Sequence, residues 1–379
     1  MNAVKLGVLI VLLVACVLLA LGYVPIPRYE PQGSGAQASG SQSQSGVPSL
    51  TRSGAADGSA HSPLTLEPEA ELDAIDRYEA GVLAMLSERK FDRLEATASD
   101  LRSTKKRFPG GPWKLHKLYN GVAMPDGGSG VSDSCWQGHL ALLKEWMRQK
   151  SDSVTPCIAL GGALVNYAWK ARGNGFANTV TDEGWSMFQQ RLEEAQTVLA
   201  RVGEKRKTDP HWYLVMETLA RGQGWDRKAF DKLFEEGVAV EPLYYYLYQD
   251  KAEYLLPRWY GEPGEWQNFA DQATRRIGGQ QGSALYFLIV DSVHRYYRTN
   301  VYSEANLSWQ RVRQGYFDLV NLYGTDAHNM NEIIVLAGMA GDRALAHEMY
   351  GKIGDRWDPQ SWRNKDLFDQ WRRWAAGTN

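Results

Sequence analysis

Apolar residues recur at intervals of three and four from Glu67 onward, which is the spacing of one face of an α-helix. The apolar stripes fall within residues 72–86, 91–101, 136–147, 158–171, 185–199, 214–219, 230–238, 244–255, 266–277, 285–297, 312–322, 333–340, 344–353 and 362–374. Runs that alternate apolar and polar residues, as half-buried strands do, are nearly absent. The pattern therefore predicts an all-α body over residues 67–379.

Short breaks separate the predicted helices. Examples begin at Pro109, Gly222, Glu241, Gly261 and Ala340. Because short links make neighbouring helices run antiparallel, we expect an irregular stack of antiparallel helical hairpins. Such a stack would be similar to a tetratricopeptide solenoid.

Two windows carry parts of the tetratricopeptide pattern. In the first, Phe234, Gly237 and Pro242 keep the spacing of the aromatic, small and terminal proline positions, and Ala229 lies one residue out of register. In the second, residues 337–353 place small residues, a Gly-Asp turn and a second helix in the same order. Neither window matches the whole pattern, so any repeat is irregular.

The first 28 residues differ from the body, because residues 6–24 are apolar and carry no charge. Their length is close to the roughly 20 residues that span a bilayer as a helix. Lys5 and Arg28 place one positive charge on each side, which orients the segment poorly. Three interpretations stay open: an uncleaved transmembrane anchor, a lipoprotein signal acylated at Cys16, and a secretory signal cleaved near residues 20–22.

All three interpretations place the body at or beyond the cytoplasmic membrane. We expect an inner-membrane anchor with the body in the periplasm or extracytoplasmic space of a bacterial cell envelope; a lipoprotein or a secreted protein is the alternative. Between anchor and body, residues 29–66 are predicted to be a disordered linker, since residues 31–63 are rich in Gly, Ser, Ala and Gln and lack aromatic residues. As a flexible coil they would span roughly 30 Å.

Charge and composition limit the classes of molecule that this chain is expected to bind. The chain has 42 basic and 44 acidic residues and a net charge of −2, so it predicts no nucleic-acid partner. Aliphatic, aromatic and cysteine residues make up 44% of the chain, which allows a sizeable core.

The spacing of reactive and metal-ligating residue types along the sequence predicts no catalytic site, no metal site and no cofactor. The sequence contains no Gly-x-Ser-x-Gly elbow, phosphate loop or His-Glu-x-x-His pair. The acid pairs at 193–194 and 235–236 are adjacent, so their side chains point to different sides of a helix. Cys135 and Cys157 start successive predicted helices, which argues against a disulfide, although a folded-back loop leaves that pairing open.

Several short motifs resemble a known family. They lie at Trp146 and at residues 151–156, 158–160, 167–173, 209–213, 241–244 and 256–261. They are similar to those of an uncharacterised bacterial family, domain of unknown function four-zero-three-four, over roughly residues 83–278 with a similar tail to 357. The resemblance implies a mostly helical, tetratricopeptide-like body and carries no reaction or substrate.

Aromatic residues beside basic ones are the remaining functional signal, because exposed Tyr and Trp near Arg or Lys are typical anchors for protein partners. The candidate binding residues are Trp169, Arg172, Tyr244, Tyr248, Trp259 and Tyr297. The consecutive tyrosines 244–246 are predicted not to be all buried, since three neighbours on one helix cannot all face the core. Gly173 is predicted to end the helix that carries Arg172, whose guanidinium would need a partner if it turned inward.

These patterns favour a membrane-tethered extracytoplasmic scaffold that binds a protein or peptide. One alternative is a cell-envelope enzyme, for example a glycan-acting hydrolase, on the same helical fold. A passive structural stalk is the other. A cavity with two carboxylates, or a histidine with a carboxylate, would favour the enzyme.

Overall fold

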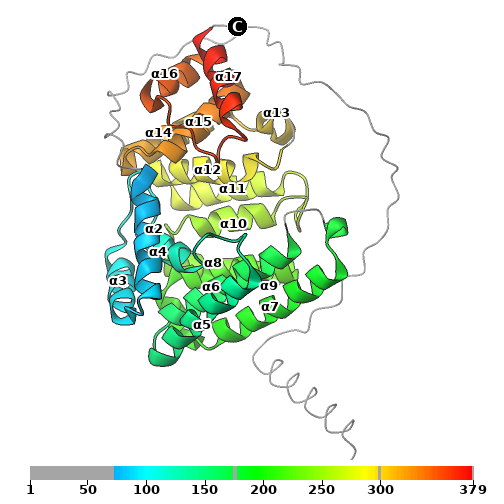
Figure 1. Ribbon diagram of the computed structural model, residues 1–379. Coiled ribbons are helices and arrows are strands. Elements are labelled where there is room, and N and C mark those ends of the chain that lie inside the picture. Colours follow the sequence, from blue (N-terminus) through cyan, green and yellow to red (C-terminus); the bar gives the residue numbers. More distant parts are fainter. Residues whose placement is uncertain (1–71, 174–176, 298–299, 378–379) are drawn as a thin grey trace, which may run out of the picture. The chain divides into compact units, whose positions relative to one another are not determined.

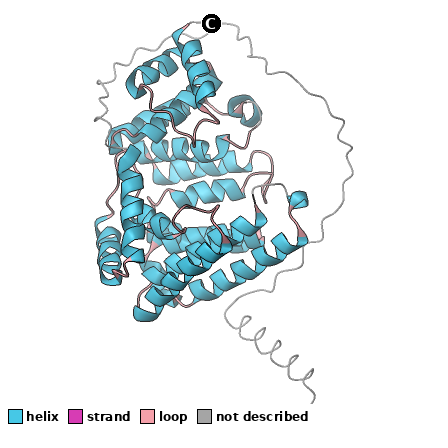
Figure 2. Cartoon of the chain, in the orientation of Figure 1, coloured by secondary structure: helices cyan, strands magenta, loops and turns pink. Residues whose placement is uncertain are grey.

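The computed structural model describes residues 72–377 except 174–176 and 298–299, and these residues form an all-helical body (Figures 1 and 2). In this part of the chain the only β contact is an isolated antiparallel bridge between Arg107 and Trp113. The prediction of an all-α class is therefore confirmed. The predicted membrane or signal segment, Cys16 and the whole predicted linker lie outside the described residues. None of the helices in the described part is long and apolar enough to cross a membrane.

The helices follow one another through short connections. They are α2 (Leu72–Ser87), α3 (Phe91–Thr104), α4 (Lys114–Val122), α5 (Asp133–Gln149), α6 (Thr155–Arg172), η1 (Ala177–Thr179), α7 (Asp182–Ala200), η2 (Gly203–Thr208), α8 (Pro210–Gln223), α9 (Arg227–Val240), α10 (Tyr246–Tyr254), α11 (Glu265–Ile277), α12 (Gly279–His294), α13 (Val301–Ala305), α14 (Trp309–Tyr323), α15 (Ala327–Ala340), α16 (Arg343–Ile353) and α17 (Lys365–Ala376).

Side-chain caps explain several helix starts. Thr181 accepts a hydrogen bond from the Gly184 N–H at the start of α7, and Asp209 accepts one from the His211 N–H at the start of α8. The helix end predicted at Gly173 is confirmed, since this residue has φ of 72° and its N–H donates to the Trp169 carbonyl. Local sequence therefore sets where these helices begin and end.

Five helices form a connected series that we call the inner row: α4, α6, α8, α10 and α12. Each packs against the next, and α4 also reaches α8. The helices between them in sequence pack alongside, with α5 and α7 against α6, α9 against α8, and α11 against α12; α14, which follows α12 in the chain, also packs against α12. Figure 1 shows α8, α10 and α12 one above another in the body. Side chains from one face of each inner-row helix can therefore meet.

Close helix crossings depend on glycine. Gly315 on α14 faces α12, and a Cβ atom at this position would lie 2.4 Å from the Ser283 carbonyl oxygen. At Gly338 on α15, a Cβ atom would lie 2.0 Å from the Trp371 ring of α17. Both helices approach their neighbours more closely than any larger residue would allow without a shift.

The three consecutive tyrosines are not all buried, as the sequence predicts. Tyr244 and Tyr245 are buried, and Tyr246 is half-buried. They do not share one helix, however, because α10 begins only at Tyr246, so the first two rings lie before the helix and do not follow helical spacing.

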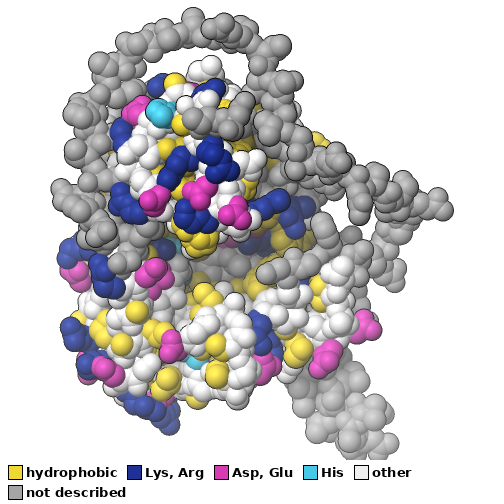
Figure 3. Space-filling view, turned by 45° about the horizontal axis from the view of Figure 1, so that its top comes forward, with side chains coloured by type: hydrophobic (Ala, Val, Ile, Leu, Met, Phe, Trp, Pro, Cys, Tyr) yellow, Lys and Arg dark blue, Asp and Glu magenta, His cyan; other side chains and the backbone are white. Residues whose placement is uncertain are grey.

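The surface seen in Figure 3 mixes charges of both signs. Basic and acidic side chains of the described residues lie among one another there. Many form ion pairs between helices, such as Arg311 with Asp271 at 2.6 Å and Arg276 with Glu235 at 2.7 Å. Exposed pairs of this kind add little stability, about 0–1 kcal/mol each.

Candidate functional site

The inner row lines an open cavity of about 340 Å³, with both polar and apolar groups in its wall. We call it the inner-row cavity. It is lined by His116, Asn120 and Ala123 from α4 and its end; Gly162, Val165 and Asn166 from α6; His211, Leu214, Val215 and Thr218 from α8; Tyr246, Gln249, Asp250 and Glu253 from α10; and Ser292, Arg295 and Tyr296 from α12 and its end. Within each helix these residues are spaced by one, three or four, so they share a face.

Neutral hydrogen-bonding groups come from every helix of the row. Asn166 donates from its side-chain nitrogen to the Ala123 carbonyl at 3.1 Å, and Gln249 donates to the Leu288 carbonyl at 3.0 Å. The Asn120 nitrogen lies 3.1 Å from His116 Nε2. A primary amide has two N–H donors and one carbonyl acceptor. One such bond therefore orients each side chain and leaves it further capacity to donate and accept.

Histidine and tyrosine rings form one wall of the cavity. The His116 ring stacks on Tyr246 with centroids 3.7 Å apart, and the His211 ring stacks on Tyr119 at 4.4 Å. His211 Nδ1 lies 2.8 Å from the Tyr244 hydroxyl. Burial lowers the pKa of His211 to about 3. Burial, with added repulsion from His211 and Lys117, holds the pKa of His116 well below its usual value. Both imidazoles are therefore neutral at pH 7.

Behind this wall lies a buried anchor at Asp209. Its carboxylate accepts hydrogen bonds from the Tyr119 hydroxyl at 2.6 Å and from Arg102 at 3.0 Å, besides capping α8 through the His211 N–H at 2.9 Å. Because Tyr119 stacks on His211, this network positions the imidazole at the cavity wall. The network joins α3, α4 and α8 at one point.

An acidic corner lies on the α10 side of the cavity. Arg221 makes ion pairs with Glu253 at 2.6 Å and with Asp250 at 3.2 Å, and the Tyr296 hydroxyl donates to Glu253. Burial raises the pKa of Asp250 to about 6, although Arg221 opposes this rise. In the described part of the chain Asp250 Oδ2 is buried without a hydrogen-bond partner. Arg295 is exposed at the edge of the same cavity.

The structure brings three of the predicted binding residues together away from the cavity. Arg172 lies over the rings of Trp169 and Trp259 at 5.4 and 5.7 Å, and over Trp185 at 5.5 Å. Its guanidinium also donates to the Gly173 carbonyl at 3.2 Å. The half-buried arginine thus lies among aromatic faces, where cation–π attraction stabilises it.

The other predicted binding residues are not exposed anchors. Tyr244 and Tyr248 are fully buried; Tyr244 bonds to His211, and Tyr248 donates to the Pro242 carbonyl at 3.1 Å. Tyr297 is half-buried and its hydroxyl accepts from the Trp266 indole N–H at 2.5 Å. Their hydroxyls bind groups of the chain itself, so they contribute to packing; only Tyr244 touches the wall of the cavity.

Sequence reasoning missed the residues that line the cavity. Sequence reasoning considered only adjacent acid pairs as catalytic candidates, whereas Asp250 and Glu253 are three residues apart and so share a helix face. Asn166 within an apolar stripe was a further signal, because an amide inside a buried helix needs a polar partner. The two cysteines are both free, with Cys135 exposed and Cys157 buried.

Comparison with known proteins identifies no relative. No family model matches the chain, and neither a curated protein nor a solved structure matches it. A function is therefore inferred from the geometry of the cavity alone.

Proposed function

We propose that the helical body is a peptide-binding scaffold that receives a short peptide segment or chain end in the inner-row cavity. In this proposal the fold is an irregular, tetratricopeptide-like stack of helical hairpins, and residues 6–24 tether it to the membrane. The supporting observation is that all five inner-row helices contribute a neutral hydrogen-bonding side chain to one cavity: Asn120, Asn166, Thr218, Gln249 and Ser292.

The chemistry of a peptide backbone favours this interpretation of the cavity. Each peptide unit offers one N–H donor and one C=O acceptor. The amide side chains can both donate and accept, whereas the hydroxyls of Thr218 and Ser292 donate within the chain and can accept from a ligand. The volume lies near the lower end of the roughly 300–1,000 Å³ found for small-ligand sites, so it suits a few atoms of chain and not a folded surface. The acids of the corner are already paired with Arg221, which leaves the neutral groups to bind.

A photo-crosslinking experiment tests this proposal. A photoreactive residue replaces Arg295 at the cavity edge of the full-length chain, and in a matched control it replaces the exposed Glu348 on α16. After illumination of the cell envelope, mass spectrometry identifies the crosslinked segments. We expect segments captured from position 295 and not from position 348.

Two cavity variants sharpen the test. Thr218→Val and Gln249→Met remove hydrogen-bonding groups with little change in volume. Each should weaken capture from position 295 by about 2- to 10-fold, since one hydrogen bond contributes roughly 0.5–1.5 kcal/mol. Capture that is equal from both positions, or unaffected by both variants, would contradict peptide binding in the cavity.

A second candidate function is hydrolysis in the same cavity, because the cavity holds two carboxylates, Asp250 and Glu253, which is the arrangement expected of an enzyme. It stands second because both acids form ion pairs with Arg221. A carboxyl group with a pKa near 6 and an unpartnered oxygen has the properties of a general acid or base. Turnover of a peptide or glycan substrate that Asp250→Asn abolishes, and that Thr218→Val retains, would support the enzyme over the scaffold.

A further inference from the structure

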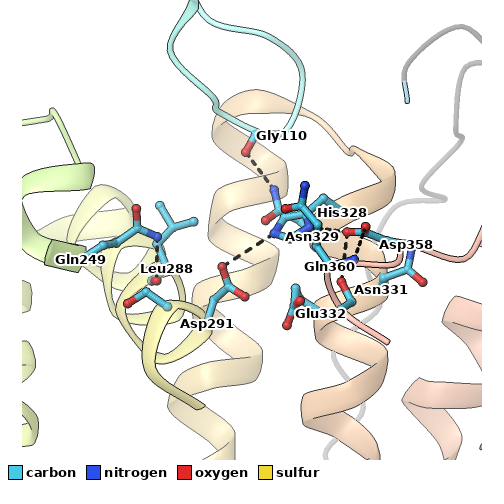
Figure 4. A network of polar contacts seen from close by, with 12 residues as sticks. Gly110, Gln249, Leu288, Asp291, His328, Asn329, Asn331, Glu332, Asp358 and Gln360 are labelled. Atoms are coloured by element: carbon cyan, nitrogen blue, oxygen red, sulfur yellow. Dashed lines mark hydrogen bonds and ion pairs between the residues drawn. The ribbon is translucent and has the colours of Figure 1, made fainter. Parts of the chain in front are cut away.

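Beyond the inner-row cavity, α12 and α15 bring together acidic and imidazole side chains. Asp291 comes from α12, and His328 and Glu332 come from α15 (Figure 4). His294 also lies on α12. We propose that Asp291, His328 and Glu332 bind one divalent transition-metal ion, such as Zn²⁺ or Mn²⁺. The proposal is independent of peptide binding in the cavity.

The ligand atoms have the separation that a metal ion requires. One atom from each of the three side chains lies within 4.8 Å of the other two. Asp291 Oδ2 and His328 Nε2 are 4.0 Å apart, which is too far for a hydrogen bond. Two metal–ligand bonds of about 2.1 Å would span this gap.

His328 is oriented as a metal ligand would be. Its Nδ1 lies 2.5 Å from Asp358 Oδ2, an arrangement in which Nδ1–H donates to the carboxylate, and its Nε2 lies on the side of Asp291, where a metal ion would displace the Nε2 proton. Asp358 is fixed in turn by the Gln360 N–H at 2.8 Å and the Ser361 hydroxyl at 3.1 Å. A carboxylate behind a ligating histidine is the usual second partner in metal sites.

Glu332 is oriented in a similar way, because His294 Nε2 lies 2.8 Å from its carboxylate. Both acids of the proposed site are more than nine-tenths buried. Asp291 Oδ1 is buried without a hydrogen-bond partner in the described part of the chain. A buried carboxylate oxygen without a partner costs free energy, and a bound cation would remove this cost.

Solvent access to the three ligands and their chemical type indicate which metal ions could bind. The side chain of His328 is 39% exposed, so an ion can reach the ligands from that side. Two oxygen ligands and one imidazole nitrogen suit Zn²⁺, Mn²⁺ or Fe²⁺ better than the all-oxygen preference of Ca²⁺. Three protein ligands also leave a coordination position for water, as in catalytic zinc sites.

Metal binding is tested on the full-length protein, purified in detergent without a polyhistidine tag. The protein is stripped with a chelator, incubated with Zn²⁺ or Mn²⁺, and desalted, and the bound metal is measured by elemental analysis. We expect close to one equivalent of one of these ions. In the wild type, Co²⁺ should also give the visible absorption of a nitrogen- and oxygen-ligated ion, a readout that needs no variant.

Three variants locate the site. His328→Ala should lower the affinity at least 10-fold, and Asp358→Asn, which alters only the positioning carboxylate, should lower it roughly 10- to 100-fold. His347→Ala removes an exposed histidine on α16 and should leave binding unchanged. Circular dichroism checks that each variant is folded. A wild type that binds none of the three ions, or a His328→Ala variant that binds as tightly as the wild type, would show that the cluster is only an ion-pair network.

Discussion

At the scale of single residues, the cavity is shaped by polar groups that burial keeps neutral or paired. His211 lies between the Tyr119 ring and the Tyr244 hydroxyl. No acidic side chain is placed directly on its ring nitrogens by these contacts, so nothing there favours the charged imidazolium. The low pKa of this histidine is therefore a consequence of its packing, and it links the stability of the fold to pH.

Replacing His211 with glutamine should flatten the acid dependence of stability. The pKa of His211 is about 3 in the folded chain, against about 6.5 for an ordinary histidine. The unfolded chain therefore takes up a proton first, so stability is complete above pH 6.5 and falls as the pH is lowered toward 3. Between pH 7 and pH 4 this costs the wild type about 3 kcal/mol, which the His211→Gln variant should not lose.

Urea unfolding at both pH values measures this difference. His347→Gln serves as the control, since it keeps His211 and should follow the wild type. His116 contributes in the same direction in every variant, because its pKa is also lowered by burial. Parallel losses of stability in His211→Gln and the wild type would refute the assignment of the acid sensitivity to His211.

At the scale of helices, α12 of the inner row packs against α14 at a crossing that leaves no room for a side chain larger than that of glycine. Gly315 lets α14 approach α12, and the same α12 supplies Ser292 to the cavity and Asp291 to the proposed metal site. A shift of α12 would therefore disturb both places. Helix propensity alone would favour alanine at such a position, so the glycine reflects tertiary packing.

Two glycine-to-alanine substitutions distinguish the effect of tight helix packing on stability from the effect of helix propensity. Gly315→Ala places a Cβ atom 2.4 Å from the Ser283 carbonyl oxygen, and the forced shift should destabilise the fold by about 1–3 kcal/mol. A Cβ atom added at Gly351 on α16 would meet no other atom within 4 Å, so Gly351→Ala should hold stability constant or raise it by up to about 1 kcal/mol. Thermal unfolding of the two variants measures the contrast; equal effects of the same sign would show that packing at Gly315 is not limiting.

At the scale of the whole molecule, the described helices belong to one compact unit. Contacts within this unit connect α2 through α17, whereas the predicted apolar segment at residues 6–24 lies outside the described residues. We therefore expect the body to fold without that segment. The membrane association expected from the sequence would then belong to the segment alone.

Deletion of residues 1–28 tests whether the body folds without the N-terminal segment and whether that segment alone binds the membrane. The full-length chain should sediment with membranes, and the shortened chain should stay in the supernatant with an unchanged helical circular dichroism spectrum and melting temperature. A shortened chain that still sediments with membranes would show that the body binds them by itself. A shortened chain that loses its helical spectrum would contradict independent folding.

Much of the fold follows from patterns in the sequence, whereas little of either candidate site does. Apolar spacing predicted the all-α class, and Thr181 and Gly173 mark a helix start and a helix end, because these signals act between residues close in the chain. The tyrosines at 244–246 are not all buried, as predicted, but they do not lie on one helix, because α10 begins two residues later than the apolar pattern indicates.

The sequence by itself determined which segments are helical and where several of them stop, because hydrogen bonds to i−4 and capping groups are local. Only the tertiary structure decided which polar residues meet. Asp291 and His328 lie 4.0 Å apart because α12 and α15 place them there, and Asn166 reaches the same cavity as Gln249 because α6, α8 and α10 pack in a row. Such pairings depend on helix packing between residues distant in sequence, and no spacing rule along a single chain encodes them.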